Sequence, residues 1–367
     1  MPASHCAISP HPPPFFTEPT QENRCFLQAF EWNVPPPFET GGTTHWARLK
    51  AVLPDLKRIG VDAIWIPPAC KASGGADTTG YDIYDLYDLG EFEQKGTRAT
   101  KWGSKEELAE LCRVARECED GVGVYFDAVL NHKAGADREE KCQVVEVAAE
   151  DRTKEIGEIH EITAWLGFDF PGRGDKYSSM KYGWQHFSGT DWDSKNKKRG
   201  IFRIVGENKY WSHSVGTESG NADFLMFADV DFSHPDVQKD VTAWGEWVVR
   251  ELGLAGFRFD AVQHFSERYL NEFVANLEDK FGKDKLFLVG EFWVGDQDTL
   301  CAYLRNMHHN FSLYDTPLVN NFSRISCTEM ADLRTVFDDT LVQVEPYNAV
   351  VCMHQWLISL ALRWFVC

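Results

Sequence analysis

The stretch "GFRFDAVQHF", residues 256 to 265, combines an apolar strand pattern with two charged side chains. Arg258 and Asp260 stand two residues apart, so in a β-strand they lie on the same face. Burying two charges is costly unless each satisfies the other. The pair is therefore either a structural ion pair or a nucleophilic carboxylate held by its neighbouring guanidinium. The choice depends on whether other carboxylates join it.

Short apolar runs of this kind alternate with amphipathic stretches, a pattern typical of repeated βα units and a parallel sheet. Ser104 and Glu107 have the spacing of a helix capping box. Residues from about 133 to 220 are polar, glycine-rich and aromatic without a sustained helical period, which predicts a small inserted subdomain. The expected strands are 26–32, 63–68, 122–132, 256–262, 287–293 and 311–318, and the expected helices are 45–60, 104–121, 236–253 and 266–282.

Composition and charge narrow the class of protein. The chain has 367 residues, 43% of them hydrophobic, which is enough for a large core. A net charge of −19 would repel a phosphate backbone, so we expect no nucleic-acid partner. No run reaches the ~20 apolar residues of a membrane span, so we expect no membrane association. The N-terminus lacks the pattern of a secretory signal and the ten cysteines are scattered, which favours free thiols and a cytoplasmic location.

Three carboxylates stand near the ends of predicted parallel strands: Asp127, Asp260 and Glu291. A single acid at such a position is more often structural than catalytic. The carboxyl ends of parallel strands converge on one face, where barrel enzymes carry their active sites. Three acids on that face therefore favour catalysis.

The segments "DAVLNH" (127–132), "GFRFDAVQH" (256–264) and "GEFW" (290–293) resemble three signature regions of the α-amylase family, the retaining glycoside hydrolases of family 13. Residues 80–104, 186–193 and 223–237 resemble the liquefying bacterial amylases and their intracellular fungal relatives. The resemblance covers roughly residues 24 to 348. It implies the α/β class and a (β/α)8 TIM barrel with a subdomain inserted after the third strand.

The same resemblance divides the chain into five parts. We expect the barrel to be incomplete, with the last strand or strands and the C-terminal β-domain missing. The expected parts are a disordered tail (1–22), the first part of the barrel (23–132), the inserted calcium-linked subdomain (133–222), the second part of the barrel (223–350) and a divergent tail (351–367).

The activity that this resemblance implies is endo-acting hydrolysis of α-1,4-glucans, namely starch, glycogen or maltooligosaccharides, by a monomer. Asp260 matches the nucleophile and Glu291 the general acid/base, a pair that a retaining mechanism places ~5 Å apart. His132 matches a residue that contacts the sugar at the cleavage subsite, and Tyr81 matches its aromatic platform. The predicted substrate-binding set is Arg258, His132, Tyr81, Asp127, Gln263 and His264, with Gln263 standing where relatives usually carry lysine.

Calcium is the cofactor that the resemblance implies. Asn131, Asp223, Asp229 and the backbone carbonyl of His264 match its ligands, and oxygen donors of this kind suit calcium. Some relatives carry an additional metal cluster, which we expect to be lost here. Three serines, Ser188, Ser212 and Ser233, occupy the aspartate positions of that cluster.

The last residues depart from the family pattern. Relatives continue beyond the segment that matches 344–350 into an Asn-His-Asp signature that carries a third catalytic carboxylate. This sequence reads "VCMHQWLISLALRWFVC" over 351–367 and has no acidic residue after Glu345. The alternative to an active hydrolase is therefore a truncated, inactive or weakly active homologue that binds glucan.

Overall fold

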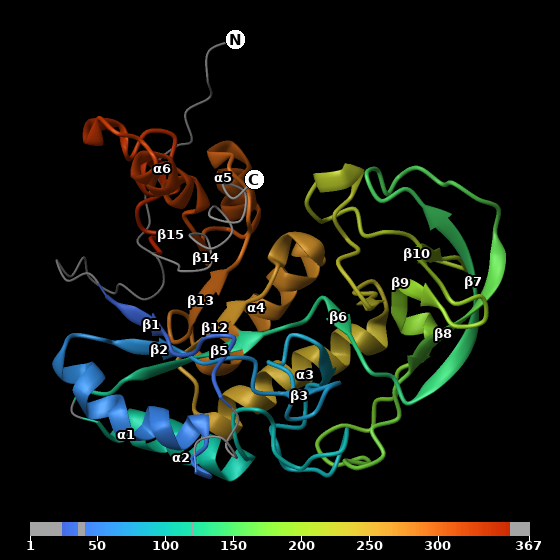
Figure 1. Cartoon of the computed structure of the whole chain (residues 1–367), viewed down its shortest axis with the longest axis horizontal. Coiled ribbons are helices and arrows are strands. Elements are labelled where there is room, and N and C mark those ends of the chain that lie inside the picture. The colour runs from blue at the N-terminus through green and yellow to red at the C-terminus, as the bar shows by residue number, and fades with distance from the viewer. Residues whose placement is uncertain (1–23, 36–40, 119, 353–367) are drawn as a thin grey trace. The chain divides into compact units, whose positions relative to one another are not determined.

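The computed structural model describes residues 24–35, 41–118 and 120–352, which form two compact units (Figure 1). The larger unit extends to Gly282, and the smaller unit begins at Lys283. The predicted tail at 1–22 lies outside the described residues, and so does the predicted tail at 351–367 except for its first two residues. No helix in the described part of the chain is both long enough and apolar enough to cross a membrane.

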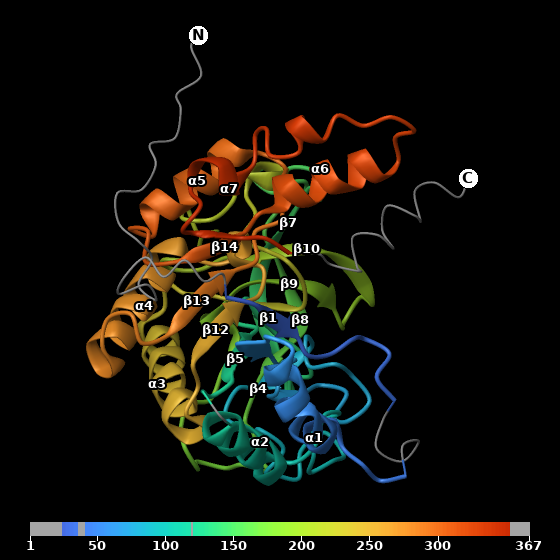
Figure 2. The same cartoon turned by 90° about the vertical axis from the view of Figure 1, so that its left-hand side faces the viewer.

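The larger unit contains four parallel strands that pair in the order β1, β2, β5, β12. Four helices follow them along the chain. Each helix contacts the next one, and Figure 2 shows them lying beside the strands. The strands are β1 (Phe26–Gln28), β2 (Ala63–Trp65), β5 (Gly123–Ala128) and β12 (Gly256–Phe259), and the helices are α1 (His45–Arg58), α2 (Lys105–Glu117), α3 (Pro235–Leu252) and α4 (Glu267–Phe281).

Local sequence explains where these elements begin and which side they bury. Ser104 accepts a hydrogen bond from the Glu107 backbone N–H at 3.3 Å, and the Glu107 carboxylate accepts one from Ser104 N–H at 2.9 Å. The predicted capping box of α2 is therefore confirmed. Phe126 of β5 and Phe257 of β12 pack on Trp244 of α3, and all three are fully buried. These aromatic contacts fix α3 against the strands.

An antiparallel sheet is inserted between β5 and α3, after the third parallel strand, as the sequence predicted. Its strands pair in the order β6, β11, β9, β10, β7, β8. Figure 1 labels β6 to β10 of this sheet. Their bounds are β6 (His132–Lys133), β7 (Arg138–Val147), β8 (His160–Gly167), β9 (Phe187–Asp193), β10 (Lys198–Ile204) and β11 (Ala228–Val230). A short hairpin of β3 (Lys71–Ala72) and β4 (Ile83–Asp85) precedes α2.

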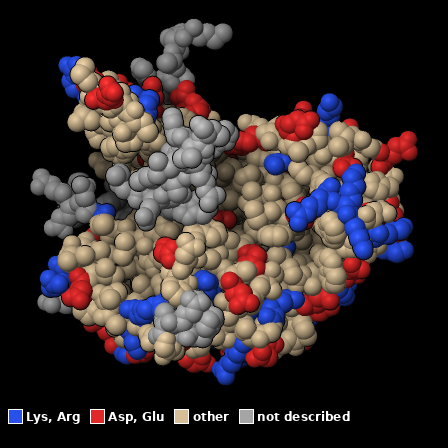
Figure 3. Space-filling view, in the orientation of Figure 1, with Lys and Arg blue, Asp and Glu red and all other residues tan. Residues whose placement is uncertain are grey.

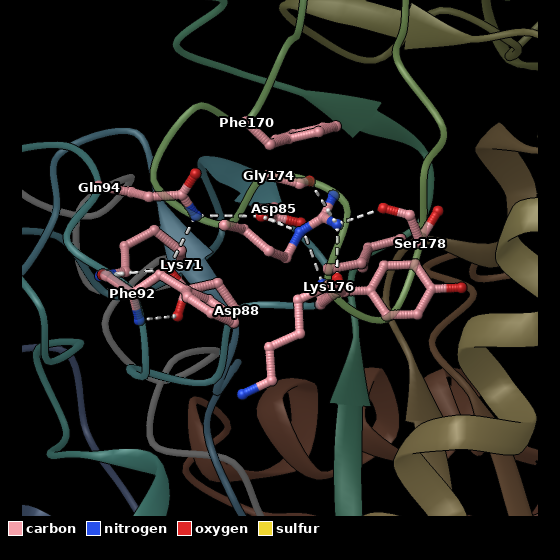
Figure 4. A network of polar contacts seen from close by, with 12 residues as sticks. Lys71, Asp85, Asp88, Phe92, Gln94, Phe170, Gly174, Lys176 and Ser178 are labelled. Carbon is pink, nitrogen blue, oxygen red and sulfur yellow. Dashed lines mark hydrogen bonds and ion pairs between the residues drawn. The ribbon is translucent and has the colours of Figure 1, made fainter.

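A buried polar network holds this hairpin against the inserted subdomain (Figure 4). Lys71 and Asp88 are fully buried, with Nζ and Oδ2 3.4 Å apart. Gln94 donates to both Asp85 and Asp88, at 3.0 and 2.9 Å. Asp85 also accepts from Nε of Arg173 at 2.8 Å. Since Arg173 belongs to the inserted segment, the network connects that segment to the loop after β2.

The smaller unit repeats the βα pattern with three parallel strands. Its elements are β13 (Phe287–Gly290), α5 (Gln297–Asn306), β14 (Ser312–Tyr314), α6 (Thr316–Ser326), α7 (Leu341–Val344) and β15 (Ala349–Val350). The expected strand over 311–318 is wrong beyond Tyr314, because Asp315 accepts from the Leu318 backbone N–H at 3.0 Å and starts α6. The described residues thus contain seven parallel strands of the βα type, one fewer than a complete (β/α)8 barrel. The fold class is an incomplete barrel with an inserted antiparallel sheet.

Candidate active site

A pair of adjacent parallel strands brings the charges of "GFRFDAVQHF" together with a second carboxylate. The register of β12 on β5 places Arg258 opposite Asp127. One guanidinium nitrogen of Arg258 donates to Asp127 at 2.6 Å and to Asp260 at 2.8 Å. Arg258, Asp127 and Asp260 are 3%, 2% and 9% exposed. The two charges of the sequence motif therefore belong to a buried three-residue cluster.

Asp127 lies at the centre of the hydrogen bonding in this cluster. Its second oxygen accepts from Nε1 of Trp65 at 3.0 Å and from the hydroxyl of Tyr81 at 2.8 Å. Burial raises the pKa of Asp127 to about 7, although Arg258 opposes this shift. The guanidinium of Arg258 also lies over the Trp65 ring, 4.7 Å from its centroid. Strands β2, β5 and β12 and the loop after β2 thus converge on one carboxylate.

Tyr81 and His132 lie next to each other beside this cluster. Nε2 of His132 donates to the Tyr81 carbonyl at 2.8 Å, and Nδ1 has no partner among the described residues. Burial lowers the pKa of His132 to about 4, so the ring is neutral near pH 7 and Nδ1 is an acceptor. Trp32 was not predicted from the sequence. Its ring stacks on that of Tyr81, with 5.0 Å between the ring centroids. An aromatic residue just after a strand end was the available signal.

The other predicted site residues lie directly after strands β12 and β13. Gln263 and His264 lie in a short 3-10 turn, Val262–His264, where the Gln263 carbonyl accepts from Gly216 N–H at 2.8 Å. Nδ1 of His264 donates to the Ala222 carbonyl at 2.5 Å. Glu291 belongs to the smaller unit, directly after β13, and its carboxylate accepts a hydrogen bond from Nε1 of Trp293. That the carboxylates of Asp260 and Glu291 face each other remains a prediction.

The predicted calcium ligands gather where the parallel strands meet the inserted sheet. Nδ2 of Asn131 donates to Asp229 at 2.9 Å, while its buried Oδ1 has no partner among the described residues. Burial raises the pKa of Asp223 to about 7, and burial together with Asp223 raises that of Asp229. Two neighbouring buried carboxylates and an unpartnered amide oxygen form an oxygen-only donor set, which suits a hard cation. The residues therefore fit calcium.

A second group of possible metal ligands is less suitable. Ligand atoms of His186, His234 and Asp236 lie within 4.8 Å of one another. However, Nδ1 of His186 accepts from Gly183 N–H at 2.9 Å, and Nδ1 of His234 accepts from Asp236 N–H at 3.2 Å. In neutral rings the protons then sit on Nε2, so neither ring offers a lone pair to a metal while these bonds persist.

The comparisons with known proteins place this site in a family. Residues 38–357 match the family described as "Alpha amylase, catalytic domain", so the chain belongs to the α-amylase family. It is 42% identical to the α-amylase of Bacillus licheniformis over 329 residues, which are 89% of this chain and 62% of that protein. It is 35% identical to the cytoplasmic α-amylase of Escherichia coli over 331 residues, 89% of this chain and 65% of that protein. The chain thus spans about three-fifths of the length of these relatives.

Solved structures agree on the fold. An Anoxybacillus α-amylase matches with a TM-score of 0.55 at 16% identity, over 94% of this chain and 65% of that one. An α-amylase from Geobacillus thermoleovorans, solved with acarbose, matches with a TM-score of 0.52 at 19% identity, over 85% of this chain and 56% of that one. At these identities the likeness concerns the fold alone.

Proposed function

We propose that this chain is an endo-acting α-1,4-glucan hydrolase that works by the retaining mechanism, with Asp260 as nucleophile and Glu291 as general acid/base. The observation that carries the proposal is the Arg258 guanidinium, which donates to both Asp260 and Asp127 at the ends of β12 and β5. Membership of the α-amylase family supports it, because the residues of this cluster belong to the segments that resemble the family signatures.

In this mechanism the Asp260 carboxylate attacks the anomeric carbon while Glu291 gives a proton to the departing glycosidic oxygen. The attack forms a glycosyl ester on Asp260. Glu291 then takes a proton from a water molecule that attacks the same carbon and releases Asp260. Arg258 holds the attacking carboxylate in one orientation through its 2.8 Å bond. The nucleophile is thereby positioned before the substrate arrives.

The neighbouring side chains suit a sugar ring. The hydrogen bond from the Tyr81 hydroxyl to Asp127 fixes the tyrosine ring. This ring would stack on the apolar face of a pyranose. Nδ1 of His132, an acceptor, would meet a sugar hydroxyl. Gln263 and His264 would line the side of the site toward the leaving glucan. The substrates would be starch, glycogen or maltooligosaccharides, and membership of the α-amylase family supports an α-glucan ligand.

We assign calcium to Asn131, Asp223, Asp229 and the carbonyl of His264. When bound, the ion supplies a structural link between the inserted subdomain and the parallel strands and takes no part in the proton transfers. A monomer in the cytoplasm is the expected setting, and the name of the Escherichia coli relative supports that location.

Release of reducing ends from soluble starch tests the proposal. The purified chain is compared with Asp260→Asn and Glu291→Gln, and each variant should lose at least about a hundredfold in rate. Asp55→Asn, at an exposed carboxylate on α1, serves as the matched control and should keep full activity. Equal rates in all four proteins would contradict the assignment. Starch binding without any hydrolysis would favour the glucan-binding alternative.

A further inference from the structure

Lys209 is a buried lysine in the inserted subdomain that the proposed chemistry does not use. Its side chain is about as buried as that of Asp231, with each residue 6% exposed. The ammonium forms an ion pair with Asp231 and donates to the carbonyls of Gln185 and Phe187, the latter at 3.2 Å. Three oxygens thus surround one positive charge, an arrangement like that of a small bound cation.

Asp231 belongs to the same cluster as the proposed calcium ligands. Asp231 interacts electrostatically with both Asp223 and Asp229, and all three aspartates are buried. With all three ionised, their charge is −3, and the Lys209 ammonium reduces it to −2. Arg152 is within electrostatic reach of Asp229, but Glu218 lies within reach of the same guanidinium and offsets it. One divalent cation, with a charge of +2, would balance this charge of −2.

Three neutral serines also contact this cluster. The hydroxyl of Ser188 donates to Asp229, and that of Ser233 donates to Asp231 at 2.5 Å. The Ser212 backbone N–H donates to Asp223 at 2.9 Å. These serines satisfy carboxylate oxygens but add no negative charge, so they offer little to a further metal ion.

We propose that the Lys209 ammonium is a built-in monovalent cation, which completes the charge balance of the Asp223, Asp229 and Asp231 cluster so that it takes up one divalent ion and no second metal. The inference rests on the calcium site proposed above. The role of Lys209 can be tested separately from the calcium site. In a variant without this lysine, an ammonium ion from solution should take the place of the lysine ammonium group, because the two groups resemble each other.

The first experiment replaces Lys209 by alanine. Removing one partner of a buried pair is strongly destabilising. We therefore expect Tm to fall by on the order of 5–10 °C in tetramethylammonium chloride, whose cation is much larger than the lysine ammonium group. The same concentration of ammonium chloride should recover most of that fall. The double variant Lys209→Ala/Asp231→Asn, which also lacks the carboxylate that pairs with Lys209, should respond equally to both salts.

Lys195→Ala is the matched control. Lys195 is exposed in the turn between β9 and β10, where Figure 3 shows lysine and arginine side chains gathered. This variant should match the wild type in both salts. An equal response of Lys209→Ala to the two salts would overturn the role of Lys209, as would failure of that variant to fold even in ammonium chloride.

Calorimetric titration of the chelator-treated wild type with calcium counts the divalent ions. One ion per chain is expected. Two ions would overturn the charge balance while leaving the calcium site in place. No binding would refute the calcium site itself and the count of one, whatever the result with ammonium.

Discussion

Arg258→Leu removes the donor that Asp127 and Asp260 share. Arg258 is 3% exposed, and the two hydrogen bonds from its guanidinium measure 2.6 and 2.8 Å. Removing one partner of a buried pair costs ~3–5 kcal/mol, so we expect the free energy of unfolding at pH 8 to fall by about that amount. Arg258 lowers the pKa of Asp127, which burial raises to about 7. Its stabilising effect is therefore larger where Asp127 is charged, and the loss should shrink between pH 8 and pH 5.

Urea unfolding followed by tryptophan fluorescence at pH 5 and pH 8 measures both effects. Arg113→Leu is the control, because this arginine pairs with Glu110 and Glu117 on the exposed side of α2, where water screens the charges. It should change stability little at either pH. Similar losses in the two variants, or a loss at Arg258 that does not depend on pH, would refute the shared-donor interpretation.

Three further results are expected. Burial lowers the pKa of His45 to about 4, so the native ring stays neutral where the unfolded chain takes a proton, below about pH 6.5. The free energy of unfolding should therefore fall by ~3 kcal/mol between pH 6.5 and pH 4. Urea titrations of His45→Gln should show a weaker dependence of stability on pH over this range. Arg173→Met leaves Asp85 without its guanidinium and should speed chymotrypsin cleavage within residues 168–182, whereas Lys141→Met, at an exposed ion pair, should leave the cleavage rate unchanged. In protein shown to contain calcium, excess chelator should lower Tm by mass action, and an unchanged Tm would count against the Asp223 and Asp229 site.

The parts of the fold that could be predicted from the sequence are those specified by residues close together in the chain. The Ser104 and Glu107 spacing located the start of α2, because a capping box needs only residues three apart. Alternating apolar and amphipathic runs located six of the seven described parallel strands, but β15 was not expected. The strand expected through residue 318 failed because Asp315, read as a strand residue, caps a helix instead.

The contacts that position the site depend on distant residues and could not be predicted in this way. Asp127 accepts hydrogen bonds from Trp65 and Tyr81, which are 62 and 46 residues away in sequence. Lys209 and Asp231 are 22 residues apart and meet only because the inserted sheet brings their loops together. No short-range periodicity encodes such pairs. The same holds for the strands of the inserted sheet, whose pairing is interrupted by shifts in register.

The most direct test of the proposed function is to label the nucleophile. A fluorinated α-glycosyl fluoride reacts with a retaining hydrolase to form a slowly hydrolysed glycosyl ester, and mass spectrometry of a pepsin digest locates it. We predict one sugar on the peptide that contains Asp260 and none on the Asp260→Asn variant. A sugar on a different carboxylate, or no labelled peptide in the wild-type chain, would contradict the assignment of Asp260 as the nucleophile.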